Sequence, residues 1–198
     1  MSVLERSVRF NGMSIRALVA RRKTQSRFAV KGQHPDWDKI TPELDVNDKE
    51  FFVVCGRAEQ GALRPILTAI HCPYGQKGDH LWVRETLSVV PDHDEPAGLS
   101  AILYRADAYG PYGKWRASTQ MPREASRFLL EIDSIRVERL HDISETDAVA
   151  EGASRDDQPD TEHFTMDESV RVDTFQYRSI WKDEMQGWSW ECNPWVWV

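Results

Sequence analysis

Apolar residues near the start of the chain recur with helical spacing. Ile15 and Leu18 fall on one face of a helix over residues 12–22. Asn11 or Ser14 can cap its first turn, because short polar side chains accept hydrogen bonds from free backbone N–H groups there. The pattern therefore predicts one short amphipathic helix close to the N-terminus.

Two further segments carry helix signals. Residues 144–152 begin with Ser144 as a cap, have acidic residues in the first turn and end at Gly152, which predicts a short helix. An approximate apolar stripe over roughly residues 168–185 predicts a second, longer one.

Short apolar or alternating runs predict strands through most of the remaining chain. They cover residues 26–31, 51–55, 66–70, 81–87, 101–105, 128–140 and 195–198. The alternation in 128–140 is strong enough to predict one long strand. Residues 34–49 are turn-rich and are predicted to form a loop, and 72–79 form a turn. Together these elements predict an α+β protein built on a mostly antiparallel barrel or sheet.

The five tryptophans near the C-terminus admit two interpretations. Trp181, Trp188, Trp190, Trp195 and Trp197 could stack nucleic-acid bases, or they could close a small hydrophobic core. Buried aromatic side chains dominate core energetics, so the core interpretation is favoured.

Composition limits the class of protein. A chain of 198 residues with 40% hydrophobic content suits a single domain with a real core. It has no apolar run of about 18 residues and no signal-peptide pattern, so we expect a cytoplasmic protein without membrane contact. The three cysteines, Cys55, Cys72 and Cys192, are widely spaced, which argues against a disulfide framework. We expect no metal site, since no Cys-x2-Cys or His-x3-His pair exists.

The net charge of -7 hides a basic N-terminal region. Residues 1–31 hold eight Lys or Arg side chains against Glu5 alone, so the rest of the chain is strongly acidic. A basic face can bind an anion, or it can simply be a solvated helix surface.

The densest cationic stretch is residues 21–27, Arg-Arg-Lys-Thr-Gln-Ser-Arg. Lys23 stands three residues before Ser26, and a lysine whose pKa is lowered by cationic neighbours can take a proton from a hydroxyl. The arginines at this helix exit are equally suited to phosphate oxygens. The stretch therefore favours either acyl-transfer chemistry or anion binding.

Several ordered blocks resemble a known family, the ASCH domain of the PUA-like superfamily, in the longer form encoded by bacteriophages and prophages. The blocks are residues 22–27, 72–86, 121–127, 140–152 and 193–198. The resemblance implies a single domain over residues 1–198, a mostly antiparallel PUA-like β-barrel with flanking helices. It also implies loop insertions at about 32–70, 88–120 and 152–170.

The resemblance further implies an activity. The best-defined enzymes of the family are amidohydrolases that release the acyl group from N(4)-acetylcytidine with a lysine, a threonine and a glutamate. By motif, Lys23 matches the lysine, Ser26 the threonine nucleophile and Glu151 the glutamate. Serine stands where the motif usually has threonine, and both side chains offer a hydroxyl.

Each matched residue has a chemical role in acyl transfer. Lys23 would act as general base on Ser26, its pKa lowered by Arg22, Arg27 and partial burial, and Glu151 would orient Lys23 or protonate the leaving amine. No cofactor is implied. Further side chains expected to bind a substrate or nucleic acid are Arg21, Arg22, Thr24, Arg27, Arg84 and Glu85.

Two other functions stay open from the sequence. One is a non-catalytic PUA-like protein that binds RNA or a modified nucleotide, and the other is a ribonuclease. In simpler interpretations Lys23 and Arg27 only contact an anion, Glu151 is an exposed helix residue and Ser26 is a strand hydroxyl. A closed pocket at which Lys23, Ser26 and Glu151 converge would favour hydrolysis, whereas outward-pointing arginines along a groove would favour nucleic acid.

Overall fold

A computed structural model describes most of the chain. The described residues are 3–34, 37–44, 50–56, 66–90, 102–107, 110–111, 113–153, 177–178, 181 and 189–198. The α-helices whose bounds lie within them are α1 (Gly12–Val19) and α2 (Glu145–Ala150). The strands are β1 (Glu5–Arg9), β2 (Phe28–Ala29), β3 (Trp37–Leu44), β4 (Glu50–Gly56), β5 (Ile66–Ile70), β6 (His80–Arg84), β7 (Leu87–Val89), β8 (Ile102–Tyr104), β9 (Leu129–Glu131), β10 (Val137–Arg139) and β11 (Trp195–Trp197).

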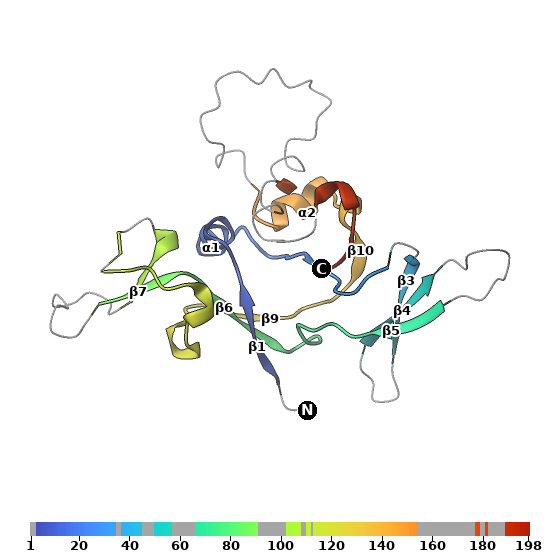
Figure 1. The fold of residues 1–198 in the computed structure, drawn as a ribbon, viewed down its shortest axis with the longest axis horizontal. Coiled ribbons are helices and arrows are strands. Elements are labelled where there is room, and N and C mark those ends of the chain that lie inside the picture. Colours follow the sequence, from blue (N-terminus) through green and yellow to red (C-terminus); the bar gives the residue numbers. More distant parts are fainter. Residues whose placement is uncertain are drawn as a thin grey trace, which may run out of the picture.

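The strands form four small sheets, with orders β1-β6-β9, β10-β11-β2, β3-β4-β5 and β7-β8. All pairs among the described strands are antiparallel except β1 with β6. In Figure 1 the sheet β3-β4-β5 lies at one side and β7 at the other, with β1, β6 and β9 between them. The α+β class with mostly antiparallel pairing is confirmed, but the described strands do not close into a barrel.

Both predicted short helices are confirmed, with the expected caps. The side chain of Asn11 accepts a hydrogen bond of 2.8 Å from the backbone N–H of Ser14 at the start of α1. Ser144 and Asp147 form a reciprocal capping box at the start of α2. Of the helix predicted over 168–185, Tyr177, Arg178 and Trp181 are helical, and its other residues lie outside the described part.

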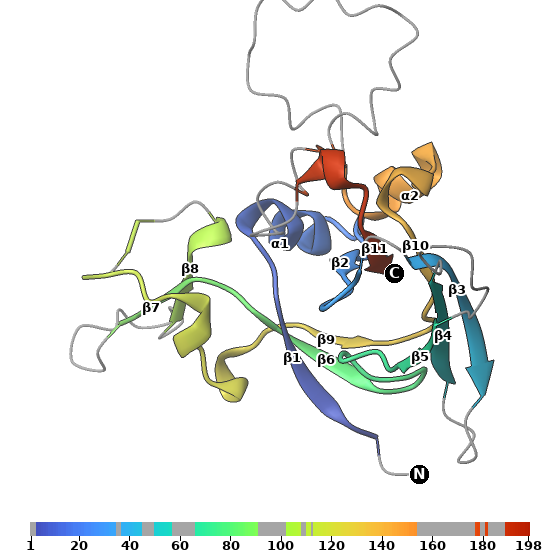
Figure 2. The same ribbon diagram turned by 45° about the vertical axis from the view of Figure 1, so that its right-hand side comes forward.

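The long strand predicted over residues 128–140 is instead two strands in two sheets. Just after β9, the backbone of Ile132 exchanges hydrogen bonds with Gly78 and Asp79. Just before β10, the backbone of Arg136 exchanges hydrogen bonds with Val198. Only residues 133–135 are free of these ladders, and there the chain passes from one sheet to the other (Figure 2). The alternation is real in each half, but alternation alone does not reveal a bend between sheets.

The loop predicted over residues 34–49 contains an eight-residue strand, β3, paired with β4. Pro42 lies within it, and β3 is the edge of its sheet, where a residue without a backbone N–H is tolerated. The strands predicted at 51–55, 66–70, 101–105 and 195–198 are confirmed as β4, β5, β8 and β11. The run 81–87 divides between β6 and β7, and 26–31 yields only the two-residue β2.

Large aromatic side chains contribute to a core that is otherwise mostly aliphatic. Trp181, Trp195 and Trp197 are all buried, as the core interpretation predicted. Trp190 packs against the cluster that contains Trp181, whereas Trp188 lies outside the described residues. Within the part of the chain that the structure describes, no helix has the length and apolar character needed to span a membrane. The insertions predicted at about 88–120 and 152–170 fall partly outside the described residues.

Candidate active site

The end of α1 turns the chain toward α2. Arg21 adopts the left-handed conformation, with φ 58, that most often belongs to glycine. The backbone N–H of Arg21 then bonds to the carbonyl of Leu18, and that of Arg22 to Ala17, which closes the helix in a Schellman motif. Lys23 therefore leaves the helix at a defined angle.

α2 ends in the same motif and meets this turn directly. Gly152 has φ +99, and a Cβ on it would lie 2.6 Å from the Cβ of Ala17 in α1. The backbone N–H groups of Thr24 and Gln25 both donate to the carbonyl of Ala150, at 2.7 and 3.0 Å. The last carbonyl of α2 thus accepts hydrogen bonds from the segment that carries Lys23, and these bonds hold that segment against the end of α2.

Lys23 and Glu151 meet at this junction although 128 residues separate them. The Nζ of Lys23 donates to the Oε2 of Glu151 and to its backbone carbonyl, each at 2.9 Å. Both side chains are only 1% exposed. An ammonium carries three N–H groups, and among the described residues Lys23 has hydrogen-bond acceptors for two of them.

Arg27 lies behind Glu151, away from solvent. Its Nη1 donates to the Oε1 of Glu151 at 2.9 Å, and its Nε and Nη2 donate to Oε1 of Glu138. Its Nη2 also lies 3.5 Å from Asp147. Burial alone would lower the pKa of Arg27, but the charges of Glu151 and Glu138 outweigh this and raise it. Arg27 therefore stabilises carboxylates inside the cluster and does not line the cleft described below.

An outer layer of charge closes the cluster. Arg136 donates to Glu138 and to Asp147, each at 3.1 Å, and to the side chain of Gln25 at 3.1 Å. Burial favours the neutral form of Asp147, but hydrogen bonds from Ser144 and Gln25 and the charge of Arg27 outweigh it and lower the pKa of that carboxyl.

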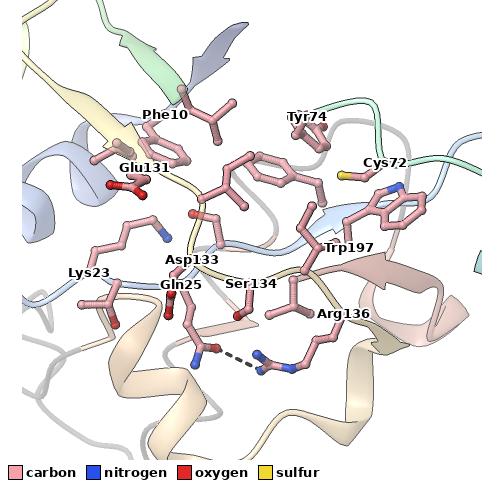
Figure 3. A pocket seen from close by; sticks show the side chains of 18 of the residues that line it. Phe10, Lys23, Gln25, Cys72, Tyr74, Glu131, Asp133, Ser134, Arg136 and Trp197 are labelled. Carbon is pink, nitrogen blue, oxygen red and sulfur yellow. Dashed lines mark hydrogen bonds between the residues drawn. The ribbon is translucent and has the colours of Figure 1, made fainter. Parts of the chain in front are cut away.

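A cleft of about 590 Å³ opens beside the cluster, and Lys23 forms part of its wall. Figure 3 shows the amino group of Lys23 directed into the cleft, with Gln25 and Arg136 along one side and Tyr74 and Trp197 on the other. The lining side chains belong to segments far apart in sequence: Phe10, Leu18, residues 23–26, Phe28, Cys72, Tyr74, Leu81, residues 129–136, Trp197 and Val198.

Ser26 lines the same cleft as Lys23, whereas Glu151 does not and lies behind Lys23. Among the described residues, the Ser26 hydroxyl makes no hydrogen bond with Lys23 or Glu151. The structure therefore joins Lys23 to Glu151 directly and places Ser26 in the wall that they support. Such a wall offers an amine and a hydroxyl to one ligand.

Aromatic rings form part of the cleft wall. Phe28 stacks on Tyr74 with ring centroids 4.4 Å apart, and Phe10 is nearly parallel to Phe28 at 6.3 Å. Burial raises the pKa of Tyr74 to about 12 and also raises the pKa of the Cys72 thiol. The cleft thus combines flat apolar surface with the polar residues Lys23 and Ser26.

Most of the other side chains predicted to bind a ligand lie outside the cleft. Arg21 is exposed, Arg22 donates to the carbonyl of Gly152 at 3.0 Å, and Thr24 is exposed at the cleft wall. Arg84 donates to the carbonyls of Ser118 and Thr119 and does not line the cleft. Arg22 and Arg84 thus contact backbone carbonyls of the fold, and neither side chain lines the cleft.

Glu85 belongs to a second buried ion network. It accepts two hydrogen bonds from Arg127, at 2.8 and 2.9 Å, and Arg127 also binds Asp107. Burial raises the pKa of Glu85 and outweighs the opposing effect of Arg127, and the negative charge of Asp107 adds a smaller contribution in the same direction. Glu85 does not line the cleft either, so this pair has no part in the candidate site.

Sequence reasoning missed the residues that complete the site. Glu138 and Arg136 were assigned only to the alternating run 128–140, and their spacing of two residues does place them on one side of a strand. Gln25 and Asp147 join the site through their contacts with Arg136, which no local pattern in the sequence reveals. Within the described residues, no group of three His, Cys, Asp or Glu side chains is arranged to hold a metal ion.

Comparisons with known proteins add no further constraint: no protein-family model, no curated protein and no solved structure matches the chain.

Proposed function

We propose that this protein is an amidohydrolase that removes the acyl group from an N-acylated cytosine nucleoside or a similar amide. The observation that carries the proposal is that Lys23 faces the cleft while Glu151, itself bound by Arg27, holds it from behind. A buried ion pair whose lysine faces a ligand-sized cleft is typical of an active site.

In the proposed reaction, Lys23 acts as general base on Ser26. As a neutral amine, Lys23 keeps its two hydrogen bonds to Glu151, and its lone pair takes the position that faces the cleft. It accepts the proton of the Ser26 hydroxyl while the oxygen forms a bond to the amide carbon of the substrate. The carbonyl oxygen of the substrate takes the electron pair.

The tetrahedral adduct of Ser26 and the amide carbon then breaks down by expelling the amine. The bond between the carbonyl carbon and the nitrogen of the base breaks, and the Lys23 ammonium gives its proton to that nitrogen, leaving an ester on Ser26. Water repeats the sequence: it loses a proton to Lys23, attacks the ester and releases the carboxylic acid as the proton returns to Ser26. Glu151 keeps its charge throughout and stabilises the ammonium form of Lys23.

The cleft suits a small planar ligand. Its volume of about 590 Å³ lies in the usual range for small-molecule sites. The rings of Phe10, Phe28 and Tyr74 provide apolar surface for a base. Burial of Arg27 speaks against the alternative of an RNA-binding groove, since that proposal needs its guanidinium to face solvent.

We also infer that the fold is a form of the PUA-like (ASCH) arrangement. Three features support this inference: the order of α1, the Lys23 segment and the short helix α2, the contact of Lys23 with Glu151, and the terminal strand β11 packed between β10 and β2. The extra sheet β3-β4-β5 falls within the insertion expected at about 32–70.

The test is release of cytidine from N(4)-acetylcytidine, followed by chromatography. We expect turnover by the wild type and a loss of about 100-fold or more in kcat/KM for Lys23→Ala and for Ser26→Ala. Ser134→Ala is the matched control, because Ser134 offers a second hydroxyl in the same cleft and should keep activity within a few-fold. Wild-type turnover no higher than that of Lys23→Ala and Ser26→Ala would reject the proposal.

A further inference from the structure

The charges behind Lys23 form a chain that begins and ends at the wall of the cleft. Lys23 contacts Glu151, which contacts Arg27, and Arg27 in turn contacts Glu138. Glu138 contacts Arg136, a lining residue of the cleft. The proposed reaction gives no role to the last three.

Arg27 fixes the orientation of the Glu151 carboxylate. One oxygen of Glu151 accepts from Arg27 and the other from Lys23, so the two cations together define the plane of the carboxylate. Arg27 is itself held on its far side by Glu138 from β10, through Nε and Nη2. A planar guanidinium bound by two carboxylates has little freedom to rotate. Three successive ion pairs therefore link Glu138 to Lys23, by way of Arg27 and Glu151.

The charge balance of the cluster depends on Glu138. The side chains of Lys23 and Arg27 are 1% and 0% exposed, and a single equally buried carboxylate, Glu151, lies between them. The additional negative charge comes from Glu138 and Asp147, which are 20% and 21% exposed. Arg136, 42% exposed, faces both of these from the solvent side.

Other groups near the pair contribute less. The ring of Tyr177 lies 6.0 Å from the Arg27 guanidinium, and the ring of Phe10 lies 5.2 Å from the Lys23 nitrogen. Arg22 binds the carbonyl of Gly152 next to Glu151, and Glu131 lines the cleft that Lys23 faces. Among the described residues, none of these side chains forms an ion pair with Glu151, and Glu138 is the carboxylate closest to Arg27 outside the buried trio.

We propose that Glu138 is a positioning residue: acting through Arg27, it orients Glu151 and supplies the negative charge against which Lys23 gains and loses its proton. This inference rests on the proposed function, in which Lys23 is the base, and deepens it. Without the negative charge of Glu138, the positive charge of Arg27 is less compensated. That positive charge then disfavours the ammonium form of Lys23 and favours its neutral amine. Loss of Arg136 changes the balance in the opposite sense.

The test is a pH titration of the Lys23 side-chain nitrogen by ¹⁵N NMR in the full chain, with the signal assigned by its absence in Lys23→Arg. We expect Glu138→Gln to lower the titration midpoint by about one pH unit. We expect Arg136→Gln to raise it by a smaller amount, because Arg136 is more exposed. Opposite shifts are the signature, since a general loss of packing does not produce them.

Glu5→Gln is the matched control, because Glu5 is also paired with an arginine, Arg123, at 2.9 Å and lies outside the cluster. It should leave the midpoint unchanged. Midpoints that stay at the wild-type value in both variants, or that move in the same direction, overturn the inference. If one variant does not fold, the other decides alone by the sign of its shift. The titration needs no turnover, so it separates failure of the positioning role from failure of the amidohydrolase proposal.

Discussion

Two buried ion networks of this protein have opposite compositions. In the first, one carboxylate, Glu151, lies between two cations, Lys23 and Arg27. In the second, one cation, Arg127, lies between two carboxylates, those of Glu85 and Asp107. Both networks contain side chains with almost no exposure, and both join segments far apart in sequence.

The difference between them is access to the cleft. Lys23 lines the cleft and keeps one position of its nitrogen uncommitted among the described residues. In the second network Glu85 uses both oxygens on Arg127, which also donates to Asp107 and whose guanidinium lies 4.2 Å from the ring of Tyr104. Burial and charge alone therefore do not mark a site: the first network can serve a ligand, and the second holds segments together.

The largest expected effect is at the shared centre of the first network. Glu151→Ala leaves two buried cations without their common carboxylate, so we expect a loss of about 4 kcal/mol in the free energy of unfolding. The comparison variant is Arg127→Met at the centre of the second network. Its loss should be smaller, about 2 kcal/mol, because the Arg127 side chain is 24% exposed. Urea unfolding measures both, and equal losses would contradict the difference in burial between the networks.

A smaller effect is expected at the junction that creates the first network. In Gly152→Ala the new methyl group would lie 2.6 Å from Ala17, and the residue would keep a positive φ. We expect a loss of about 2 kcal/mol together with weaker activity, because α1 and α2 must separate.

Gly78→Ala is the matched control for that substitution. Its φ is +84, but nothing lies within 4 Å of the added Cβ, so only the backbone strain of about 1 kcal/mol remains. If both glycine variants lose the same stability, close packing of α1 against α2 is not what holds Lys23 to Glu151.

The smallest expected effect is a difference in pH dependence. Burial raises the pKa of Glu85, so the stability associated with this group is full below about pH 4.5 and falls as the pH rises toward neutrality. Hydrogen bonds and Arg27 lower the pKa of Asp147, so its contribution is full above pH 3.8 and is lost on further acidification. Glu85→Gln should therefore flatten the stability curve above pH 4.5, and Asp147→Asn should flatten it below pH 3.8. The account is contradicted if Glu85→Gln changes the curve below pH 3.8 and Asp147→Asn changes it above pH 4.5.

Local signals in the sequence predicted the local structure well. Asn11, Ser144 and Gly152 mark helix ends through hydrogen bonds or φ values that involve only their near neighbours, so these positions could be identified without tertiary information. The pairing of Lys23 with Glu151 was predicted only through the resemblance of motifs. No local pattern connects two residues 128 positions apart.

The missed features all depend on tertiary contacts. Arg27 looked like a ligand-binding cation because its sequence neighbours are basic, yet its carboxylate partners come from β10 and α2. The segment 128–140 forms two strands instead of one because its first half pairs in the sheet β1-β6-β9 and its second half in the sheet β10-β11-β2. Arg84 and Glu85 were placed correctly near a strand end, but alternation sends their side chains to different partners.

The most direct measurement of the central claim is the mass of the protein caught during turnover. The wild type is mixed with excess N(4)-acetylcytidine, quenched with acid within the first turnover and digested for mass spectrometry. The account predicts one acetyl group on the peptide that contains Ser26, its absence in Ser26→Ala and its persistence in Ser134→Ala. Turnover without an acetylated peptide, or an acetyl group on Ser134 in place of Ser26, would contradict the account.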